Sequence, residues 1–570
     1  MHFYCYSAID ELTIATSLGE PDYSYYFVLK AYRPLLEALG TLEIVPNLDD
    51  AFTVQYHQRE SQGEACYVFA FAPPHKIPRD LPYRVIPVFA WEYSTLPSAD
   101  VIGDETQCWV SALTHFGEAI CHSVFAKNVV LHDVGSQISI ESIPAPLWDS
   151  CGTGRKNLLT RQAKKDHRLS FSATVIDTRN FEISPVTLYP REGVLCPLQV
   201  TSAPESSLGS VDVDLGKVSA DVILVGFYSP EGWGAWSKVD NAWIQLPRSL
   251  ARDVRLRIPI KGFGQNIGRE IFVHIGDHAM SVFLTGDLVE HEFEINVSAP
   301  VNFIRFSNID HSQQVGTDDT RNLGIGVSAI QVEQIGIPTH TTQSATAVSP
   351  SVHQLDLSGI VYTAILNPRD GRKNWTDLLT AFCYAFRHET EATLILKMTC
   401  KSVSEYLNEL FELLCQLHPF AGRVIVLHGY LETDEFEALL ENSSFVVNAS
   451  RGEGQCLPLM EFMSSGIPAI APENTAMADY ITSDCAFIVE STPEPTFWPH
   501  DNNQLLTTYW HRPSWESLFD AYATSFRVGM EQPEQYSGMA RVASERLYQF
   551  CSIEVLSKRL RTFLQQLESG

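Results

Sequence analysis

The chain has 570 residues, of which 45% are hydrophobic and 19% charged. This composition fits well-packed globular domains and excludes a largely disordered chain, and the length predicts about three domains. The formal net charge of −28 opposes general binding to nucleic acid or anionic lipid, so neither is expected as a partner.

Twelve cysteines are scattered from Cys5 to Cys551, without a C-x-x-C pair or ligand spacing to histidine. This distribution argues against structural zinc and against a disulfide-rich secreted domain. The first residues lack the basic start and apolar core of a signal peptide, and no apolar run reaches the roughly 20 residues that span a bilayer. The sequence therefore predicts a cytoplasmic protein without a transmembrane segment.

Residues 1–150 alternate short apolar runs with helical patterns. A helix is expected at 24–40, where apolar residues recur every third or fourth position up to Gly40, and another at 106–117. This alternation predicts a Rossmann-like lobe with a parallel sheet, the acceptor lobe. The runs expected as its strands are HFYCYS, TLEIVP, CYVFAFAPP, RVIPVFAWE and ISIESIPAP.

The pattern changes over residues 155–337 to short, often alternating runs separated by Gly, Asp, Asn and Pro. This is typical of an all-β sandwich or jelly roll, here inserted between two α/β lobes. Trp233, Trp236 and Trp243 in this region could stack on sugar rings, or they could pack in the core and leave the domain to contact a partner protein. Residues 338–356, rich in Thr, Ser and Pro, are expected to be a linker.

The α/β pattern returns over residues 357–500 and predicts a second Rossmann-like lobe. Residues 501–570 are expected to be helical and to brace the two lobes, with the aromatic residues of 496–518 packed at their junction. Because ligands bind beyond the carboxyl ends of strands in open α/β sheets, the active site is expected in the cleft between the lobes. The expected strands are GIVYTAIL, ATLILKM, RVIVLHG, SFVVNAS and IPAIAP, with helices near 374–388, 403–418 and 432–441.

The most informative segment is SFVVNASRGEGQCLPLMEFMSSGIPAIAP, residues 444–472. A strand ends at Ala449, a glycine-rich loop follows, and Pro458 suits the first turn of a helix. Glu461 is then expected in or near that turn, beside free backbone N–H groups, with Glu453 in the preceding loop. A carboxylate beside a helix N-terminus can accept hydrogen bonds from both hydroxyls of a ribose, while the exposed N–H groups nearby can meet a diphosphate. Simple capping of a helix start is the alternative.

The string E-G-x-x-L-P-x-x-E, followed by a small-residue helix and G-I-P-A-I-A, resembles the donor-site motif of retaining family-4 (group 1) glycosyltransferases, which have the GT-B fold. The resemblance implies that Glu453 contacts the transferred sugar and Glu461 the ribose, with Gly454 and Leu457 in the donor-binding loop. It also implies a nucleoside-diphosphate sugar as donor substrate, with no cofactor and no metal. The family continues with a glycine-containing stretch and P-E, where this chain reads ENTAMADYI.

A second segment, ILNPRDGRKNWTDLLTAF, ends the first strand of the second lobe. Related enzymes carry an arginine and a lysine here that clamp the donor diphosphate, which implies this role for Lys373 and Arg372, with Arg369 as the other arginine in reach. Cations are needed there because negative charge builds on the diphosphate as the glycosidic bond breaks. A solvated surface pair is the alternative.

In the acceptor lobe, Glu92 follows the strand of PVFAWEYSTLP, where relatives place a histidine, and His75 is a second candidate. Glu92 is expected to orient the acceptor hydroxyl or to support the oxocarbenium-like centre, and capping of the next turn is its structural alternative. Gly19, after the first strand, is expected to approach the diphosphate.

The sequence thus predicts a retaining, metal-independent hexosyltransferase that moves a sugar to a saccharide or lipid-linked saccharide acceptor. The resemblance implies a place in bacterial surface-polysaccharide synthesis. Two alternatives stay open: a GT-B phosphorylase or epimerase, and a polysaccharide-binding scaffold with a degenerate transferase lobe.

Overall fold

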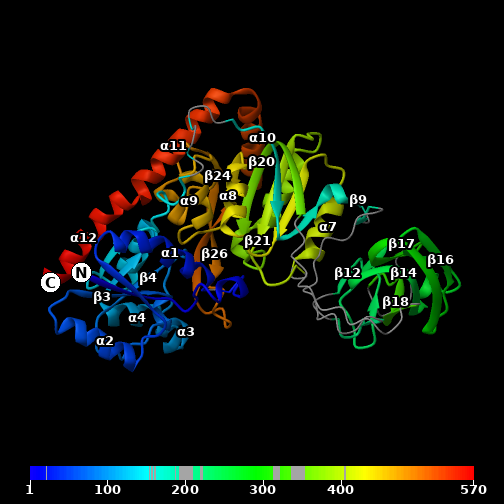
Figure 1. Ribbon diagram of the computed structural model, residues 1–570, viewed down its shortest axis with the longest axis horizontal. Helices are drawn as coiled ribbons and strands as arrows, with labels where there is room; N and C mark the ends of the chain where they lie inside the picture. Colours follow the sequence, from blue (N-terminus) through cyan, green and yellow to red (C-terminus); the bar gives the residue numbers. More distant parts are fainter. Residues whose placement is uncertain are drawn as a thin grey trace. The chain divides into compact units, whose positions relative to one another are not determined.

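The computed structural model describes residues 1–20, 22–152, 155, 158, 162–185, 188–191, 210–218, 222–311, 321–335, 353–403 and 406–569. The chain forms two compact units (Figure 1). The first comprises residues 1–170, 354–401 and 429–570, and the second comprises 171–353 and 402–428. Within the ranges given above, no helix combines the length and the apolar character that a bilayer crossing demands.

The first lobe of the first unit is built on a six-stranded, all-parallel sheet of order β2-β1-β3-β4-β5-β6. The expected Rossmann-like lobe is therefore present. Residues 118–121 form a strand that the sequence analysis missed, because four residues are too few for a periodic signal. The strands are β1 (His2–Tyr6), β2 (Thr41–Val45), β3 (Cys66–Phe71), β4 (Val85–Phe89), β5 (Glu118–Cys121) and β6 (Ser139–Ser142).

Helices cover this sheet. In α1 the buried residues recur every third or fourth position, as predicted, although the helix ends at Glu37 and not at Gly40. The Tyr32 hydroxyl donates a hydrogen bond to the carbonyl of Ile143 at 2.5 Å and fixes α1 over the sheet. The helices are α1 (Tyr23–Glu37), α2 (Asp50–Glu60), α3 (Ala99–Ile102), α4 (Trp109–Phe116) and α5 (Val124–Asp133).

The second lobe of this unit has five parallel strands in the order β25-β24-β23-β20-β21. This confirms a second Rossmann-like lobe. Residues 353–356, expected in the linker, are the first residues of β20, whereas 338–352 lie outside the described residues. The elements are β20 (His353–Leu366), α6 (Trp375–Ala385), β21 (Ala392–Met398), α8 (Thr433–Glu441), β23 (Phe445–Val447), α9 (Leu457–Ser464), β24 (Ala469–Ala471) and β25 (Ala486–Ile488).

The segment after 490 departs from the expected helices. β26 (Ser491–Phe497) and β27 (Thr507–Pro513) form an antiparallel hairpin, so the prediction for residues 501–513 is wrong. β27 contains TTYW, a run of residues that favour strands, and the prolines are tolerated because both strands lie at an edge. The expected helices begin afterwards: α10 (Trp515–Glu531), α11 (Pro533–Cys551) and α12 (Ile553–Ser569).

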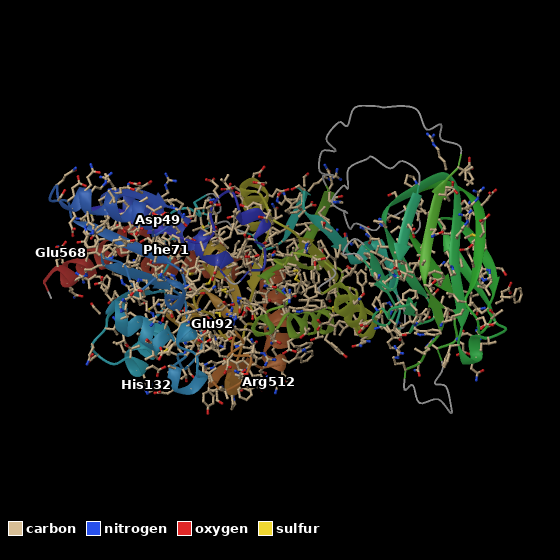
Figure 2. All side chains as sticks on the ribbon, turned by 90° about the horizontal axis from the view of Figure 1, so that it is seen from below. Asp49, Phe71, Glu92, His132, Arg512 and Glu568 are labelled. Carbon is tan, nitrogen blue, oxygen red and sulfur yellow. The ribbon has the colours of Figure 1, made fainter. Side chains whose placement is uncertain are left out.

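The last helix covers the first lobe, as expected. Leu556, Leu560 and Phe563 of α12 lie in one core cluster with residues of α1 and β1. Glu568 lies at the end of α12 (Figure 2), and Tyr67 of β3 donates a hydrogen bond to it. The junction between the lobes is aromatic: the rings of Trp498 and Trp91 have centroids 6.1 Å apart, and Trp498 is 3% exposed.

The second unit contains an antiparallel β domain of nine strands in one hydrogen-bonded sheet. Along β14, Val254, Leu256 and Ile258 are fully buried and alternate with Arg255 and Arg257, which pair with glutamates of neighbouring strands. The strands are β11 (Ser210–Asp214), β12 (Ile223–Val225), β13 (Ala235–Trp236), β14 (Ala242–Gly262), β15 (Glu270–Ile275), β16 (His278–Phe283), β17 (Val289–Ser307), β18 (Ile325–Val327) and β19 (Ala329–Gln334).

This domain bears out the expected extra β region, and its sandwich or jelly-roll type stays a prediction. Trp243 is fully buried and donates to the carbonyl of Leu188 at 2.6 Å. The ring of Trp233 carries the Lys261 ammonium 3.7 Å from its centroid, so one of its faces is covered. These contacts favour packing over sugar stacking.

Some segments belong to a different part of the fold from the one predicted for them. β7 (Lys165–Phe171), expected in the β domain, pairs with β20, and Lys165 donates to the carbonyl of Glu441 at 3.0 Å. α7 (Leu407–Leu417) and β22 (Arg423–His428) fall in the second unit, where β22 pairs antiparallel with β8 (Thr174–Asp177). That unit also contains the short hairpin of β9 (Phe181–Ile183) and β10 (Leu188–Pro190).

Candidate active site

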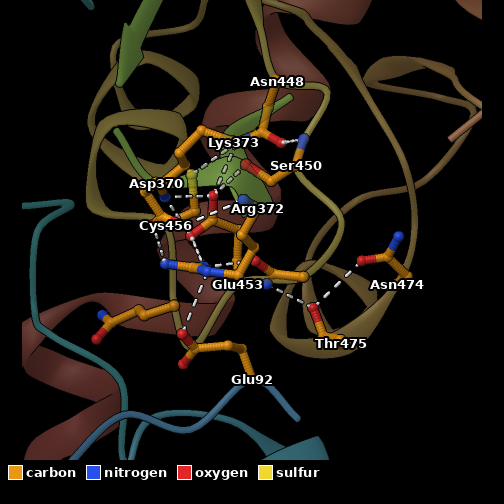
Figure 3. A network of polar contacts seen from close by, with 12 residues as sticks. Glu92, Asp370, Arg372, Lys373, Asn448, Ser450, Glu453, Cys456, Asn474 and Thr475 are labelled. Carbon is orange, nitrogen blue, oxygen red and sulfur yellow. Dashed lines mark hydrogen bonds and ion pairs between the residues drawn. The ribbon is translucent and has the colours of Figure 1, made fainter. Parts of the chain in front are cut away.

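Three loops of the first unit meet beyond the carboxyl ends of parallel strands (Figure 3). One follows β20 and contains the single-turn helix η8 (Gly371–Lys373); the second follows β23 and carries Glu453; the third follows β4 and carries Glu92. β20 and β23 belong to the sheet of the second lobe and β4 to that of the first, and open α/β sheets bind their ligands beyond the carboxyl ends of their strands. The structure therefore brings Glu453, Lys373, Arg372 and Glu92 together.

Glu453 is at the centre of this network, and its side chain is 4% exposed. The Lys373 ammonium donates to both carboxylate oxygens, at 2.7 and 2.9 Å, and Arg372 Nη1 lies 3.2 Å from Oε2. Ser450 Oγ and Asn448 Nδ2 donate to Oε1 at 2.6 and 3.2 Å. Burial alone would raise the pKa of Glu453, but Lys373 and Arg372 lower it to about 2. Glu453 is therefore ionised throughout the physiological range.

Arg372 connects the two lobes. Its Nε lies 3.3 Å from the Glu92 carboxylate of the first lobe, and its Nη2 lies 2.9 Å from Asp370. Its Nη1 also donates to the carbonyl of Gly452 at 2.5 Å. The guanidinium is 13% exposed. Burial lowers the pKa of Arg372, but the three neighbouring carboxylates more than offset this effect and raise the pKa above its ordinary value.

The cluster carries excess negative charge. Glu92, Asp370 and Glu453 face only two cations, Arg372 and Lys373, in the described part of the chain. Burial raises the pKa of Glu92, and the neighbouring Arg372 works in the opposite direction. An anionic ligand that binds here must therefore either displace a carboxylate from Arg372 or Lys373 or bind together with a further cation.

The backbone around Glu453 is strained. Asn374, Cys456 and Thr475 have φ values of 50°, 66° and 47°, in the left-handed region that non-glycine residues avoid. Such conformations cost roughly 1–3 kcal/mol each and cluster at functional sites. Thr475, a β-branched residue, accepts a hydrogen bond at Oγ1 from the backbone N–H of Glu453 at 2.9 Å. Contacts such as this hydrogen bond therefore hold the strained loop that presents Glu453.

Glu461 lies directly after the first turn of α9, and Pro458 is in that turn as predicted. Its side chain is half-buried and makes no hydrogen bond or ion pair with the residues that the structure describes. Burial raises the pKa of Glu461 to about 8, with only a small opposing effect of Lys30. Glu461 is thus largely a neutral acid at pH 7.

Gly454 allows a close approach between the lobes. A Cβ atom there would lie 2.7 Å from the Cβ of Ala90 and 3.1 Å from the backbone nitrogen of Trp91. The glycine is required by this contact with the first lobe, a reason that the sequence alone does not give. Leu457 is half-buried in the first position of α9.

The remaining predicted residues lie at the edge of the network or outside it. Gly19 has φ +80°, and a Cβ there would lie 3.1 Å from Cys400 Cα, at the end of β21. Arg369 is exposed, and its backbone N–H donates to Asn367 at 3.1 Å. His75 packs on Trp109, with centroids 5.6 Å apart, and burial lowers the pKa of His75 to about 4. Among the described residues, none of these three contacts Glu453.

Four participants were missed by the sequence analysis. Asp370 binds Arg372, Ser450 and Asn448 hold the Glu453 carboxylate, and Thr475 holds its backbone. Asn448 and Ser450 were within the quoted motif, in the NAS that ends the strand. A polar residue buried directly after a strand is the signal that could have identified them.

Two family models match the chain, one in the second Rossmann-like lobe and one in the β domain. Residues 358–497 match the family model described as glycosyl transferases group 1. Residues 217–334 match a model described as a domain of unknown function (DUF7024), which coincides with most of the β domain. No curated protein matches the chain.

Among solved structures, a glycosyltransferase from Rickettsia africae matches 37% of this chain and 48% of its own, at 12% identity and a TM-score of 0.29. The pneumococcal O-GlcNAc transferase, solved with UDP and GlcNAc, matches 36% of both chains at 17% identity and a TM-score of 0.27. Sucrose-phosphate synthase from Thermosynechococcus elongatus matches 36% of this chain and 45% of its own, at 15% identity and a TM-score of 0.27. The chain thus spans less than half of each of these relatives.

The range that matches the group 1 model contains Arg372, Lys373, Glu453 and Glu461 and coincides with the second Rossmann-like lobe. Residues 358–497 therefore constitute a domain that matches the group 1 glycosyl transferases.

Proposed function

We propose that the chain transfers a sugar, with retention of its anomeric configuration, from a nucleoside-diphosphate sugar to a saccharide or lipid-linked saccharide acceptor. The observation that carries this proposal is the buried contact of Glu453 with Lys373 and Arg372, 2.7 and 3.2 Å away, at the carboxyl ends of β20 and β23. A carboxylate held between two cations is suited to a reaction that separates charge.

In this proposal Lys373 and Arg372 bind the donor diphosphate. As the bond between the anomeric carbon and the diphosphate oxygen breaks, negative charge builds on that oxygen. Preorganised cations stabilise this charge, and one such donor is worth about 10²–10³ in rate. The two cations thereby take the part that a metal ion takes in other transferases, and we propose that the reaction is metal-independent and needs no cofactor.

Glu453 acts by its charge and not by proton transfer, because a carboxyl with a pKa of about 2 stays ionised at neutral pH. Its negative charge suits the positive charge that develops at the anomeric carbon. The new bond forms on the face that the diphosphate leaves, and the acceptor hydroxyl gives its proton to the departing phosphate oxygen. This route retains the configuration and needs no separate general base.

Glu92 enters from the acceptor lobe, with its carboxylate 3.3 Å from Arg372. Once the diphosphate takes over Arg372, Glu92 is available to orient the acceptor hydroxyl. Glu461 receives the ribose: as a half-buried group with a raised pKa, it can donate a hydrogen bond to one hydroxyl or ionise and accept from two. Gly454, Leu457, Arg369 and Gly19 are proposed to line the donor pocket around these residues.

The product is proposed to be a bacterial surface polysaccharide, a role supported by the sequence resemblance. Glu453 is in contact with both Lys373 and Arg372. These ion pairs favour an enzyme over a binding scaffold with a degenerate lobe.

Differential scanning fluorimetry against a panel of nucleoside diphosphates tests the donor site. We expect one of them to raise the melting temperature, and no stabilisation by any of them would reject it. Release of that nucleoside diphosphate from its sugar should then depend on an acceptor, persist in EDTA and disappear in Glu453→Ala. Release or interconversion without an acceptor would indicate an epimerase, and a requirement for inorganic phosphate would indicate a phosphorylase.

A further inference from the structure

A groove of about 680 Å³ opens in the first unit beside the Glu453 network. Its size is within the range of small-molecule sites, about 300–1,000 Å³. Its lining includes Val124 and Phe125 of the first lobe and, from the second, residues 473–475, 478, 479 and 488–493. The first of these stretches lies in ENTAMADYI, where the chain departs from the family motif.

The groove is connected to Glu453 by a chain of hydrogen bonds. The Glu453 backbone N–H donates to Thr475 Oγ1 at 2.9 Å, and this hydroxyl donates to Asn474 Oδ1 at 3.2 Å (Figure 3). Asn474 Nδ2 then donates to Ser491 Oγ at 3.1 Å. Thr475, Asn474 and Ser491 all line the groove. A molecule in the groove therefore lies against the residues that position Glu453.

Both lobes form the groove. The Asp479 carboxylate accepts a hydrogen bond from the backbone N–H of Val124, the first residue of α5, at 2.9 Å. On the opposite side, the hairpin of β26 and β27 contributes Thr492 and His511. An acceptor must reach a donor sugar held in the second lobe while contacting the first, so a groove shared by the lobes suits it.

The charge of the lining selects the ligand. Its ionisable residues are Glu473, Asp479, Glu490 and His511, and no Lys or Arg lines it among the described residues. Burial lowers the pKa of His511, which therefore adds no positive charge at neutral pH. Carboxylates and amides accept hydrogen bonds from sugar hydroxyls, and the carboxylates repel uronates and phosphates.

We infer that this groove binds the acceptor, and that it binds uncharged sugar units and not anionic ones. This inference rests on the proposed function, since an acceptor is meaningful only for a transferase. It names the acceptor class by chemistry: an oligosaccharide without uronate, sulfate or phosphate on the units that lie next to Glu453.

The test places a bulky side chain in the groove. Ala478 is exposed, lines the groove and makes no contact with Glu453, so Ala478→Trp should fill space without altering the cluster. The matched control is Ala51→Trp, at an exposed position of α2. Maltopentaose, cellopentaose and chitopentaose serve as uncharged probes, and tetragalacturonate as the anionic one. Binding is followed by saturation-transfer NMR.

We expect at least one uncharged probe to bind, with roughly tenfold weaker binding in Ala478→Trp and no change in Ala51→Trp. The affinity for the nucleoside diphosphate should be equal in all three proteins. Preference for tetragalacturonate, absence of binding by every uncharged probe, or binding that Ala478→Trp leaves unchanged would each overturn the inference. If the probes bind as expected but no nucleoside diphosphate does, the groove is a site for uncharged sugars, while the transferase proposal and the acceptor role of the groove both fail.

Discussion

The carboxylate of Glu92 lies 3.3 Å from Nε of Arg372, so the first lobe supplies a negative charge to the arginine that we propose for the donor diphosphate. Both partners are mostly buried, at 20% and 13% side-chain exposure, which keeps water from screening the pair. Glu92 and a diphosphate must therefore compete for one guanidinium. The affinity for the donor therefore depends on the contact of Glu92 with Arg372 between the lobes.

Neutralising Glu92 should strengthen donor binding. In Glu92→Gln, Arg372 loses one of its three carboxylate partners, and we expect the nucleoside diphosphate to bind roughly three- to tenfold more tightly. Isothermal titration calorimetry measures this directly. Glu545→Gln, which removes the partner of Arg541 on α11, is the control and should leave the affinity unchanged. Weaker or equal binding in Glu92→Gln would mean that the diphosphate does not use Arg372.

Lys373 should affect both stability and rate, and the two effects can be separated. Lys373→Met leaves the buried Glu453 carboxylate without its nearest cation, so we expect a loss of about 3–5 kcal/mol in the free energy of unfolding. Adding Glu453→Gln removes the unpaired charge and should restore most of that stability. The rate should fall about 10²–10³ in Lys373→Met, because the diphosphate has lost a cation, and should not recover in the double variant, which also lacks the Glu453 carboxylate.

Urea denaturation and turnover of the donor measure these two effects. Lys401→Met is the control, since Lys401 pairs with Glu20 at an exposed site and should change stability by less than about 1 kcal/mol. Equal stability of Lys373→Met and the double variant would show that the charge of Glu453 is not held by Lys373.

Glu461 should make stability depend on pH. Its pKa is about 8 in the folded chain against an ordinary value of 4.5, so between these values the folded state holds a proton that the unfolded state has released. The stability linked to this proton is complete below pH 4.5 and is lost as the pH rises through 8. Glu461→Gln cannot lose it, so its melting temperature should exceed that of the wild type by more at pH 8 than at pH 5, by roughly 2 °C. A difference that is independent of pH would place the pKa of Glu461 near its ordinary value.

Gly454 and Gly538 should respond in opposite directions to alanine. In Gly454→Ala the new methyl group would lie 2.7 Å from Ala90, so one lobe must shift, and we expect a loss of about 1–3 kcal/mol together with reduced activity. Gly538 lies inside α11 with no atom within 4 Å of a Cβ, and Gly538→Ala should stabilise the helix by about 0.5–1 kcal/mol. Thermal unfolding and activity of both variants test this, and a neutral Gly454→Ala would show that the lobes do not touch there.

The sequence predicts the part of the site that is formed by loops following neighbouring strands of one sheet. Glu453 and Lys373 follow β23 and β20, which pair directly, so two loops recognised separately had to meet. The strand, loop and helix around Glu461 are local, and Pro458 alone nearly fixes where α9 begins.

The rest depends on contacts between distant segments. No periodicity in the sequence indicates that Glu92 faces Arg372, because that contact depends on how one lobe packs on the other. Thr475 is an ordinary threonine in the sequence, and only its backbone conformation and its bond to Glu453 give it a role. The hairpin at 491–513 was missed because its two strands pair only with each other, and its alternation is interrupted by prolines.

The covering of the first lobe by α12 has a consequence for synthesis of the protein. β1 and α1 leave the ribosome well before Leu556 and Leu560, the leucines that seal their core. With roughly 400 residues between β6 and α12 and a rate of about 5–20 residues per second, that apolar face stays open for about 20–80 s. The first lobe is therefore a candidate for chaperone binding during translation, and its final folding step waits for the end of α12.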